Sequence, residues 1–341
     1  MSRNLAQLVC GAALTPLPAI TENASEFQVN KEAADMRTWT ACLLLLILTE
    51  SVLAQMLTKL PGHTPAIAAE VEPDWPQLPE GWNFGATPDV AVDSKGHAYV
   101  FHRGPHPIVE FDNTGKFVRS WGDGLFVSPH GLRFDRQGNL WAVDNGANFV
   151  VKMNQKGRVT LVLGQHGSKG ETEELFDGPT DIAFASNGDV FVSDGYGNSR
   201  IVKYSGDGRF LKAWGKKGSG AGEFNVPHTV VVDDRDRVYV GDRQNYRVQV
   251  FDAEGTFIEE WKNVGSPWGL SLSKDEMLFM ADGWNDRVLK LSLKGEILGV
   301  FGGPGRSPGQ FRFAHHLSLG PSGELYVAEI INMRAQKFLL R

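Results

Sequence analysis

Hydrophobic and polar residues alternate along the chain in a pattern that returns six times after residue 86. One copy, "GPTDIAFASNGDVFVSD" at 178–194, holds an alternating stretch, a turn around Gly or Asp, and a second alternating stretch that ends at an acidic residue. A period of two is typical of β-strands with one buried face. The segment that follows, "GNSRIVKYSGDGRFLKAWG", predicts two more strands joined by a D-G turn. Each copy therefore predicts four strands.

The spacing of the copies predicts the architecture. They begin at residues 87, 128, 178, 226, 266 and 313. Repeats of about 40 to 50 residues with four short strands are typical of β-propeller blades. We therefore predict an all-β fold, a six-bladed β-propeller over residues 85–341. The sixth copy ends after three strands, at "QKFLLR", so we expect residues 79–85, "PEGWNFG", at the end of a linker over 55–84, to supply its fourth strand and close the ring.

The N-terminal region has a different pattern. Met36 and Arg37 precede an apolar run over 41–48, and the small residue Ala54 follows. This pattern is typical of a secretory signal peptide, and the apolar run is much shorter than the roughly 20 residues of a transmembrane helix. We expect residues 36–54 to be a signal peptide, residues 1–35 to lie upstream of the true start, and the mature protein to be secreted or periplasmic in a bacterium. A buried helix is the alternative, but no amphipathic partner pattern lies nearby.

Charge and cysteine content narrow the function classes. The net charge is −6 and no long basic run is present, so we do not expect a nucleic-acid partner. Both cysteines, Cys10 and Cys42, precede the expected cleavage site after Ala54. The mature protein is therefore expected to have neither disulfides nor thiol chemistry, and its hydrophobic core must stabilise it.

Two sets of polar residues recur at equivalent positions of successive copies. They are the arginine of an N-x-R motif and the aspartate that ends the second strand: Arg200, Arg247 and Arg287, and Asp144, Asp194, Asp242 and Asp282. Together with the D-x-x-G turns, these positions resemble NHL repeats. Because they recur in blade after blade, we interpret them as a hydrogen-bonding scaffold, and we look for function where the blades differ.

The blades differ at the residue after the proline (Ala314 in the last copy) that opens each inner strand. In blade order these residues are Asp89, His130, Thr180, His228, Trp268 and His315. Histidine thus occupies alternate blades, which lie 120° apart in a six-bladed ring, so three imidazoles are expected to converge on the axis. Three histidines with an open fourth position are typical of a catalytic zinc site, although imidazole suits several first-row metals. Thr180 and Trp268 would form walls.

The direction of the strands adds a second set of candidates. The second strand of each blade returns to the face where the inner strand began, so the loops after "FHRG", "SDGYGN" and "GDRQN" should surround the same metal. They carry Arg103, Tyr196 and Arg243, none of which is a repeated position. Arginine presents a planar fork to a carboxylate, and tyrosine can act as a general base beside a metal and cations.

At these residues the sequence resembles peptidyl-α-hydroxyglycine α-amidating lyase. The resemblance covers residues 85–338, and its motifs are "FHRG", "PHGLRFDRQGNLWAVD", "VSDGYGNSRIV", "VPHTV" and "GDRQNYRVQVF". It implies a six-bladed propeller with zinc on His130, His228 and His315. It further implies an essential tyrosine at Tyr196 and two active-site arginines at Arg103 and Arg243.

The resemblance also implies a structural calcium ion. Its ligands would be the backbone carbonyls of Val90 and Leu132 and an aspartate directly after the third zinc histidine. This chain has His316 at that position. Histidine is a poor ligand for a hard cation that prefers oxygen, which argues against the calcium site, although Asp89, next to Val90, is a partial substitute for the missing aspartate.

The implied reaction is cleavage of a peptidyl- or N-acyl-α-hydroxyglycine to an amide and glyoxylate. Two alternatives remain open at this point: a propeller enzyme of another class, such as a lactonase, and a non-enzymatic NHL-type binding scaffold. Propeller lactonases usually offer carboxylates to calcium, whereas imidazoles are expected on this axis. The sequence leaves the physiological substrate and the oligomeric state open.

Overall fold

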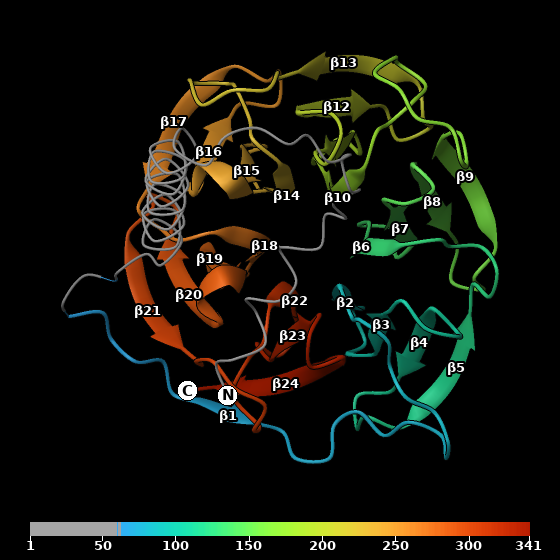
Figure 1. Ribbon diagram of the computed structural model, residues 1–341, viewed down its shortest axis with the longest axis vertical. Helices are drawn as coiled ribbons and strands as arrows, with labels where there is room; N and C mark the ends of the chain where they lie inside the picture. The colour runs from blue at the N-terminus through green and yellow to red at the C-terminus, as the bar shows by residue number, and fades with distance from the viewer. Residues whose placement is uncertain (1–59, 61–62) are drawn as a thin grey trace, which may run out of the picture. The chain divides into compact units, whose positions relative to one another are not determined.

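A computed structural model describes Leu60 and residues 63–341. Within them the chain forms six four-stranded antiparallel sheets around a central axis, so the predicted six-bladed β-propeller is confirmed (Figure 1). The signal peptide, its cleavage after Ala54 and the upstream extension lie outside the described residues. Among the residues that are described, no helix is both long enough and apolar enough to cross a bilayer.

The strands follow one another outward from the axis in each blade. Blades 1 to 3 consist of β2 (Asp89–Val92), β3 (Ala98–Phe101), β4 (Ile108–Phe111) and β5 (Phe117–Trp121); β6 (Pro129–Phe134), β7 (Leu140–Asp144), β8 (Phe149–Met153) and β9 (Val159–Gly164); and β10 (Pro179–Phe184), β11 (Val190–Asp194), β12 (Arg200–Tyr204) and β13 (Phe210–Trp214). Each blade therefore spans one copy of the sequence pattern.

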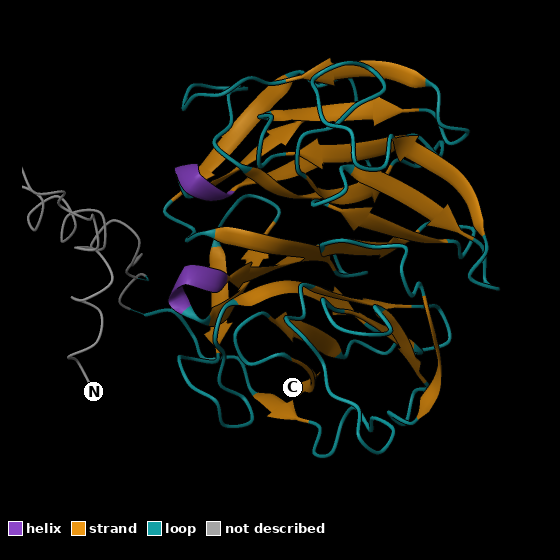
Figure 2. Ribbon diagram, turned by 45° about the vertical axis from the view of Figure 1, so that its right-hand side comes forward, coloured by secondary structure: helices purple, strands orange, loops and turns teal. Residues whose placement is uncertain are grey.

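The other three blades repeat this order with two short 3-10 helices added. They consist of β14 (Pro227–Val232), β15 (Val238–Asp242), η1 (Arg243–Asn245), β16 (Arg247–Phe251) and β17 (Phe257–Lys262); β18 (Pro267–Leu272), β19 (Met277–Asp282), η2 (Gly283–Asn285), β20 (Arg287–Ser292) and β21 (Ile297–Phe301); and β22 (Ala314–Leu319), β23 (Leu325–Glu329), β24 (Arg334–Leu340) and β1 (Ala69–Val71). Figure 2 shows both short helices on the same face of the propeller.

The ring is closed by β1, and the prediction that residues 79–85 close it is wrong. Strand β1 pairs antiparallel with β24, with Ala69 opposite Leu340. Residues 79–85 are unsuited to a strand because Pro79 has no amide N–H to donate and Gly81 adopts a φ of 79°. The segment instead turns and leads the chain into blade 1.

The hydrophobic core lies between neighbouring blades. Phe101 of blade 1 and Phe149 of blade 2 share one buried cluster. Val100 of blade 1 and Tyr326 of blade 6 share another, together with Trp75 from the segment that follows β1. Because every blade buries both faces against its neighbours, burial of apolar surface stabilises the ring as a whole and fixes the inner strands around the axis.

The repeated arginines and aspartates are structural, as their recurrence indicated. In blade 3, Arg200 Nε donates to Asp194 at 3.0 Å, and its Nη2 donates to the backbone carbonyl of Leu175 in the loop from blade 2. In blade 4, Arg247 binds Asp242 at 2.9 Å in the same way. These buried pairs tie each inner hairpin to the preceding inter-blade loop, and none of them lies at the axis.

Candidate metal centre

The three predicted metal ligands each occupy the second position of an inner strand: His130 in β6, His228 in β14 and His315 in β22. At these positions the pairing with the next strand skips residues, between Pro129 and Gly131, between Pro227 and Thr229, and between Ala314 and Leu317. Such bulges re-aim the side chain of the unpaired residue. Since the three blades alternate around the ring, the imidazoles meet near the axis.

The geometry of the three histidines suits a metal ion. One ligating nitrogen from each ring lies within 4.8 Å of the other two. The ring centroids of His130, His228 and His315 are 4.8 to 4.9 Å apart, and the side chains are almost fully buried. Burial holds the pKa of each imidazole well below its usual value, so all three are neutral and can act as ligands.

Backbone carbonyls of the alternate blades orient the three rings. The Nδ1 atoms of His130, His228 and His315 lie 2.7, 2.6 and 2.8 Å from the carbonyl oxygens of Thr180, Trp268 and Pro88. A carbonyl oxygen only accepts, so each Nδ1 must carry the proton and donate it. Each Nε2 is then left with a free lone pair, which is the tautomer that a metal requires. The donor set therefore fits a metal ion held by three imidazoles.

Tyr196 lies directly over the histidines. Its hydroxyl is 3.2 Å from Nε2 of His130 and 3.1 Å from Nε2 of His228. The residue comes from the loop between β11 and β12, and it is 41% exposed, so part of it faces solvent although its hydroxyl contacts buried histidines. The structure thus brings a phenolic hydroxyl to the atoms that would hold the metal.

Arg243 supports the tyrosine from the side. It begins η1 after β15, and its Nη1 donates to the Tyr196 hydroxyl at 3.2 Å. Its guanidinium also lies 4.4 Å from the ring centre of Trp268, within the range of a cation–π contact. Sequence reasoning treated Trp268 only as a wall, whereas the structure shows that it holds the guanidinium against the tyrosine.

Arg103 lies at the edge of the same site. It comes from the loop after β3, and its Nε donates to the carbonyl of Pro129, the residue before His130, at 3.1 Å. Neighbouring protein atoms desolvate its guanidinium and lower its pKa, yet an arginine remains charged at this position. The three loop residues that strand direction predicted, Arg103, Tyr196 and Arg243, therefore do surround the histidines.

A second buried polar cluster lies on the inner strands beyond the histidines. Arg133 donates through Nε and Nη2 to the Asp181 carboxylate at 3.1 and 2.9 Å. Its Nη1 and Nη2 also donate to the carbonyls of Leu317 and Leu270, at 3.3 and 3.2 Å. One guanidinium thus connects inner strands of four blades, and its charge offsets the carboxylate in the interior.

This cluster does not fit the calcium ion that the family resemblance implied. The Asp89 carboxylate accepts the amide N–H groups of Val90 and Leu132, both at 2.7 Å, so it is already engaged. Burial raises the pKa of Asp89 to about 8, which weakens it as an anionic ligand. His316 lies 3.8 Å from the nearest Asp89 oxygen, and burial lowers the pKa of this histidine. A neutral imidazole and the Arg133 cation occupy the region where calcium would need oxygen ligands.

Replacing Arg133 with methionine is therefore expected to destabilise the propeller strongly. Asp181 would remain buried without its counter-charge, and breaking a buried ion pair from one side typically costs about 3–5 kcal/mol of unfolding free energy. Chemical denaturation followed by tryptophan fluorescence measures this loss. Addition of EGTA to the unmodified protein should leave the unfolding midpoint unchanged.

The matched control is Arg136→Met. Arg136 lies on the same hairpin, but both Arg136 and its partner Asp234 are exposed, and exposed pairs contribute about 0–1 kcal/mol. Equal losses in the two variants would show that burial of Arg133 has no special role. A midpoint that rises with added calcium and falls with EGTA would show that an ion does bind there.

Comparison with known proteins places the chain among propellers. Residues 171–292 match a family described as a 6-bladed beta-propeller. Among solved structures, a streptogramin B lyase superimposes with a TM-score of 0.57 at 17% identity, covering 81% of this chain and 98% of that one. At this level of identity the likeness concerns the fold alone.

Curated relatives are more similar in sequence. Peptidyl-glycine alpha-amidating monooxygenase B of Xenopus laevis is 31% identical over 304 residues, which is 76% of this chain but only 34% of that protein. The chain thus spans about a third of the length of that relative. Peptidyl-alpha-hydroxyglycine alpha-amidating lyase 1 of Drosophila melanogaster is 30% identical, over 75% of this chain and 57% of that protein.

A third relative matches along most of both chains. NHL repeat-containing protein 3 of Homo sapiens is 32% identical over 304 residues, covering 81% of this chain and 86% of that protein. The hydroxyglycine amidating lyases are homologues at a similar level of identity. With its six blades of NHL-like repeats, the chain belongs to the NHL-repeat family that contains NHL repeat-containing protein 3.

Proposed function

We propose that this protein is a metal-dependent lyase that cleaves a peptidyl- or N-acyl-α-hydroxyglycine to an amide and glyoxylate. The observation that carries the proposal is the Tyr196 hydroxyl, which lies within 3.2 Å of Nε2 of two buried histidines and accepts a hydrogen bond from Arg243. A recurrent scaffold does not require such a set of non-repeated residues. Relatives named as peptidyl-alpha-hydroxyglycine alpha-amidating lyases support the choice of reaction.

The metal would be held by Nε2 of His130, His228 and His315, and we propose zinc because three neutral imidazoles with an open position are typical of a catalytic zinc site. When bound, zinc supplies Lewis acidity toward the substrate hydroxyl. The hydrogen bonds from Nδ1 to backbone carbonyls keep the three rings in the required tautomer before any ion arrives. The tautomer of each ring is thus set before the metal binds.

Tyr196 acts as the proton carrier in this proposal. As a phenolate it accepts the proton of the substrate hydroxyl, and the Cα–N bond then breaks as the carbinol carbon becomes the aldehyde of glyoxylate. The departing amide nitrogen takes the proton back from Tyr196, so protons balance over the cycle. Arg243, which donates to the same hydroxyl, stabilises the negative charge on the tyrosine oxygen. Arg103 offers its Nη groups to the substrate carboxylate or to the neighbouring carbonyl.

The two alternatives fit the site less well. A lactonase-like centre would present carboxylates to a hard cation, whereas neutral imidazoles converge on this axis and the buried carboxylate of Asp181 is paired with Arg133. A binding scaffold has no need of a tyrosine hydroxyl aimed at the nitrogens of His130 and His228. The lyase therefore accounts for more of the non-repeated residues.

Release of glyoxylate tests the proposal directly. The purified protein, loaded with zinc, is incubated with N-acetyl-α-hydroxyglycine, and glyoxylate is measured against the same protein treated with a chelator and dialysed. We expect zinc-dependent release well above the spontaneous rate, with activity restored when zinc is added back to the chelated sample. A folded, metal-loaded protein that releases no glyoxylate from any acyl-hydroxyglycine would rule the reaction out.

A further inference from the structure

The three histidines leave three gaps around the axis, one in each of the blades between them. Blade 3 lies between His130 and His228, blade 5 between His228 and His315, and blade 1 between His315 and His130. The groups around a metal site control the access of solvent to the ion. The side chain that fills each gap therefore decides how many outside ligands a metal on these histidines can take.

The indole of Trp268 fills the gap in blade 5. Its ring centre lies 5.1 Å from that of His228 and 5.4 Å from that of His315, and the residue is only 7% exposed. Trp268 stands at the second position of β18, as the histidines do in their own inner strands. The indole also contacts Arg243 from η1 and Trp284 from η2, which lie on one face of the propeller (Figure 2). It is therefore on the side of the histidines where the loops gather.

Neighbouring side chains hold the indole in this place. Trp284 and Phe313 lie edge-on to it, with 5.4 and 5.3 Å between ring centres, and edge-on to each other at 5.0 Å. The Arg243 guanidinium lies 4.4 Å from its ring centre. A buried ring that is packed on several sides cannot turn aside to admit water without losing these contacts. Trp268 is therefore a fixed part of the wall around the metal centre.

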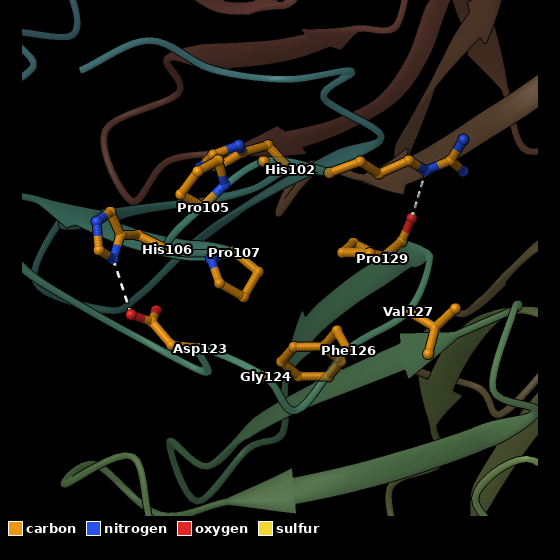
Figure 3. A pocket seen from close by; sticks show the side chains of 11 residues that line it. His102, Pro105, His106, Pro107, Asp123, Gly124, Phe126, Val127 and Pro129 are labelled. Atoms are coloured by element: carbon orange, nitrogen blue, oxygen red, sulfur yellow. Dashed lines mark hydrogen bonds and ion pairs between the residues drawn. The ribbon is translucent and has the colours of Figure 1, made fainter. Parts of the chain in front are cut away.

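The other two gaps present polar groups. On the blade 3 side, the Tyr196 hydroxyl lies within hydrogen-bonding distance of the histidines on both sides of it. On the blade 1 side, the buried Asp89 carboxylate accepts two backbone N–H groups. Arg103 lies on the same side, and Figure 3 shows its hydrogen bond to the carbonyl of Pro129. Blade 5 thus differs from blades 1 and 3 in presenting an apolar ring to the metal centre.

We infer that Trp268 keeps a bound metal four-coordinate by excluding any ligand over the gap in blade 5. The inference rests on the metal site of the proposed function. Six-coordinate geometry would need three outside ligands opposite the three imidazoles, one over each gap, whereas tetrahedral geometry needs a single outside ligand on the axis. With one gap closed, the six-coordinate arrangement is not available. Trp268 is thus a positioning residue that leaves the ion one place for an outside ligand.

Cobalt(II) tests this inference, since four-coordinate cobalt absorbs visible light much more strongly than six-coordinate cobalt. The purified protein is loaded with cobalt in place of zinc, and its visible spectrum is compared with that of Trp268→Thr. Threonine is the residue that blade 3 carries at this position, as Thr180. We expect intense bands in the unmodified protein and bands several-fold weaker in the variant, with one cobalt per chain in both. No substrate is needed, so the result does not depend on glyoxylate release.

Trp261→Thr is the matched control. Trp261 lies on β17, the outermost strand of blade 4, and is 5% exposed. Like that of Trp268, its indole N–H has no hydrogen-bond partner among the described residues. The control should lose stability to a similar extent and keep the intense bands. If Trp268→Thr does not fold, Trp268→Leu leaves a smaller void, and its bands should weaken as well.

Each other outcome has a distinct meaning. Weak bands in the unmodified protein, or unchanged bands in a folded Trp268 variant, would overturn the inference. Loss of cobalt from the Trp268 variant, or equal weakening in Trp261→Thr, would also overturn it, because the residue would then only support the fold. A folded protein that binds no cobalt would overturn the metal centre and the proposed function together. Intense bands that Trp268→Thr weakens, without glyoxylate release from any substrate, would retain the inference and overturn only the lyase reaction.

Discussion

Replacing His315 with alanine is expected to remove the bound metal and, with it, the release of glyoxylate. His315 is the best of the three ligands to change, because His130 and His228 also contact the Tyr196 hydroxyl whereas His315 has no such contact. Two imidazoles and an open side would remain, which is fewer protein ligands than a catalytic zinc site uses. Lewis-acid stabilisation is worth several kcal/mol, so turnover should fall about a thousandfold or more.

The loss of metal is measured independently of activity. Zinc per chain is determined by elemental analysis after dialysis, and zinc affinity by calorimetric titration. His315→Gln, which keeps most of the side-chain volume, serves as a second variant, and thermal melting shows whether each is folded. His63→Ala removes an exposed histidine before the first strand and should keep one zinc per chain. A folded His315→Ala protein that still binds one zinc with full affinity would contradict the three-histidine centre.

Much of this centre could be predicted because equivalent positions in successive sequence repeats occupy equivalent places in successive blades. His130, His228 and His315 occupy one position of alternate copies, and the closed ring converts that spacing into proximity at the axis. The same reasoning separated scaffold from site, since Arg200 and Asp194, which recur, bond to each other and to an inter-blade loop. The residues that the structure brings together are those that differ from the repeat and lie on loops at the face where the inner strands begin, namely Arg103, Tyr196 and Arg243.

The groups that orient the histidine rings could not be predicted from the repeat in this way. The atoms that orient the rings are the carbonyl oxygens of Thr180, Trp268 and Pro88, and any residue carries a carbonyl. Their alternation with the histidine blades follows from backbone geometry rather than from side-chain identity. Arg133 was missed for a related reason: it stands at an ordinary alternating position of β6, and only the closed ring shows that Asp181 and two carbonyls meet it.

The closing strand shows how short elements escape prediction. Strand β1 has three residues, Ala69–Val71, which is too few for an alternating pattern to stand out. Residues 79–85 directly precede blade 1, but Phe84 packs into the core between blades 1 and 6 instead of joining a strand. Tertiary contacts determine which segment pairs with the free edge of β24, and the sequence alone indicates this pairing only weakly.

Tyr196→Phe is expected to lower turnover by about 10²- to 10⁴-fold, the usual contribution of a positioned acid–base group. The change deletes only the hydroxyl, which lies within 3.2 Å of two histidine nitrogens and accepts from Arg243. The Michaelis constant should change much less than kcat, because Arg103 remains to bind the substrate. Single-turnover release of glyoxylate separates the chemical step from binding and product release.

Tyr204→Phe is the matched control, since its hydroxyl donates to the carbonyl of Glu173 in an inter-blade loop, outside the metal centre. It should cost about 1 kcal/mol of stability and leave kcat near that of the unmodified protein. Zinc content must stay at one per chain in Tyr196→Phe, because its hydroxyl is not one of the three ligands. If turnover persists with zinc bound, the proton carrier is another group. If turnover and zinc are lost together, Tyr196 supports the metal and does not carry the proton.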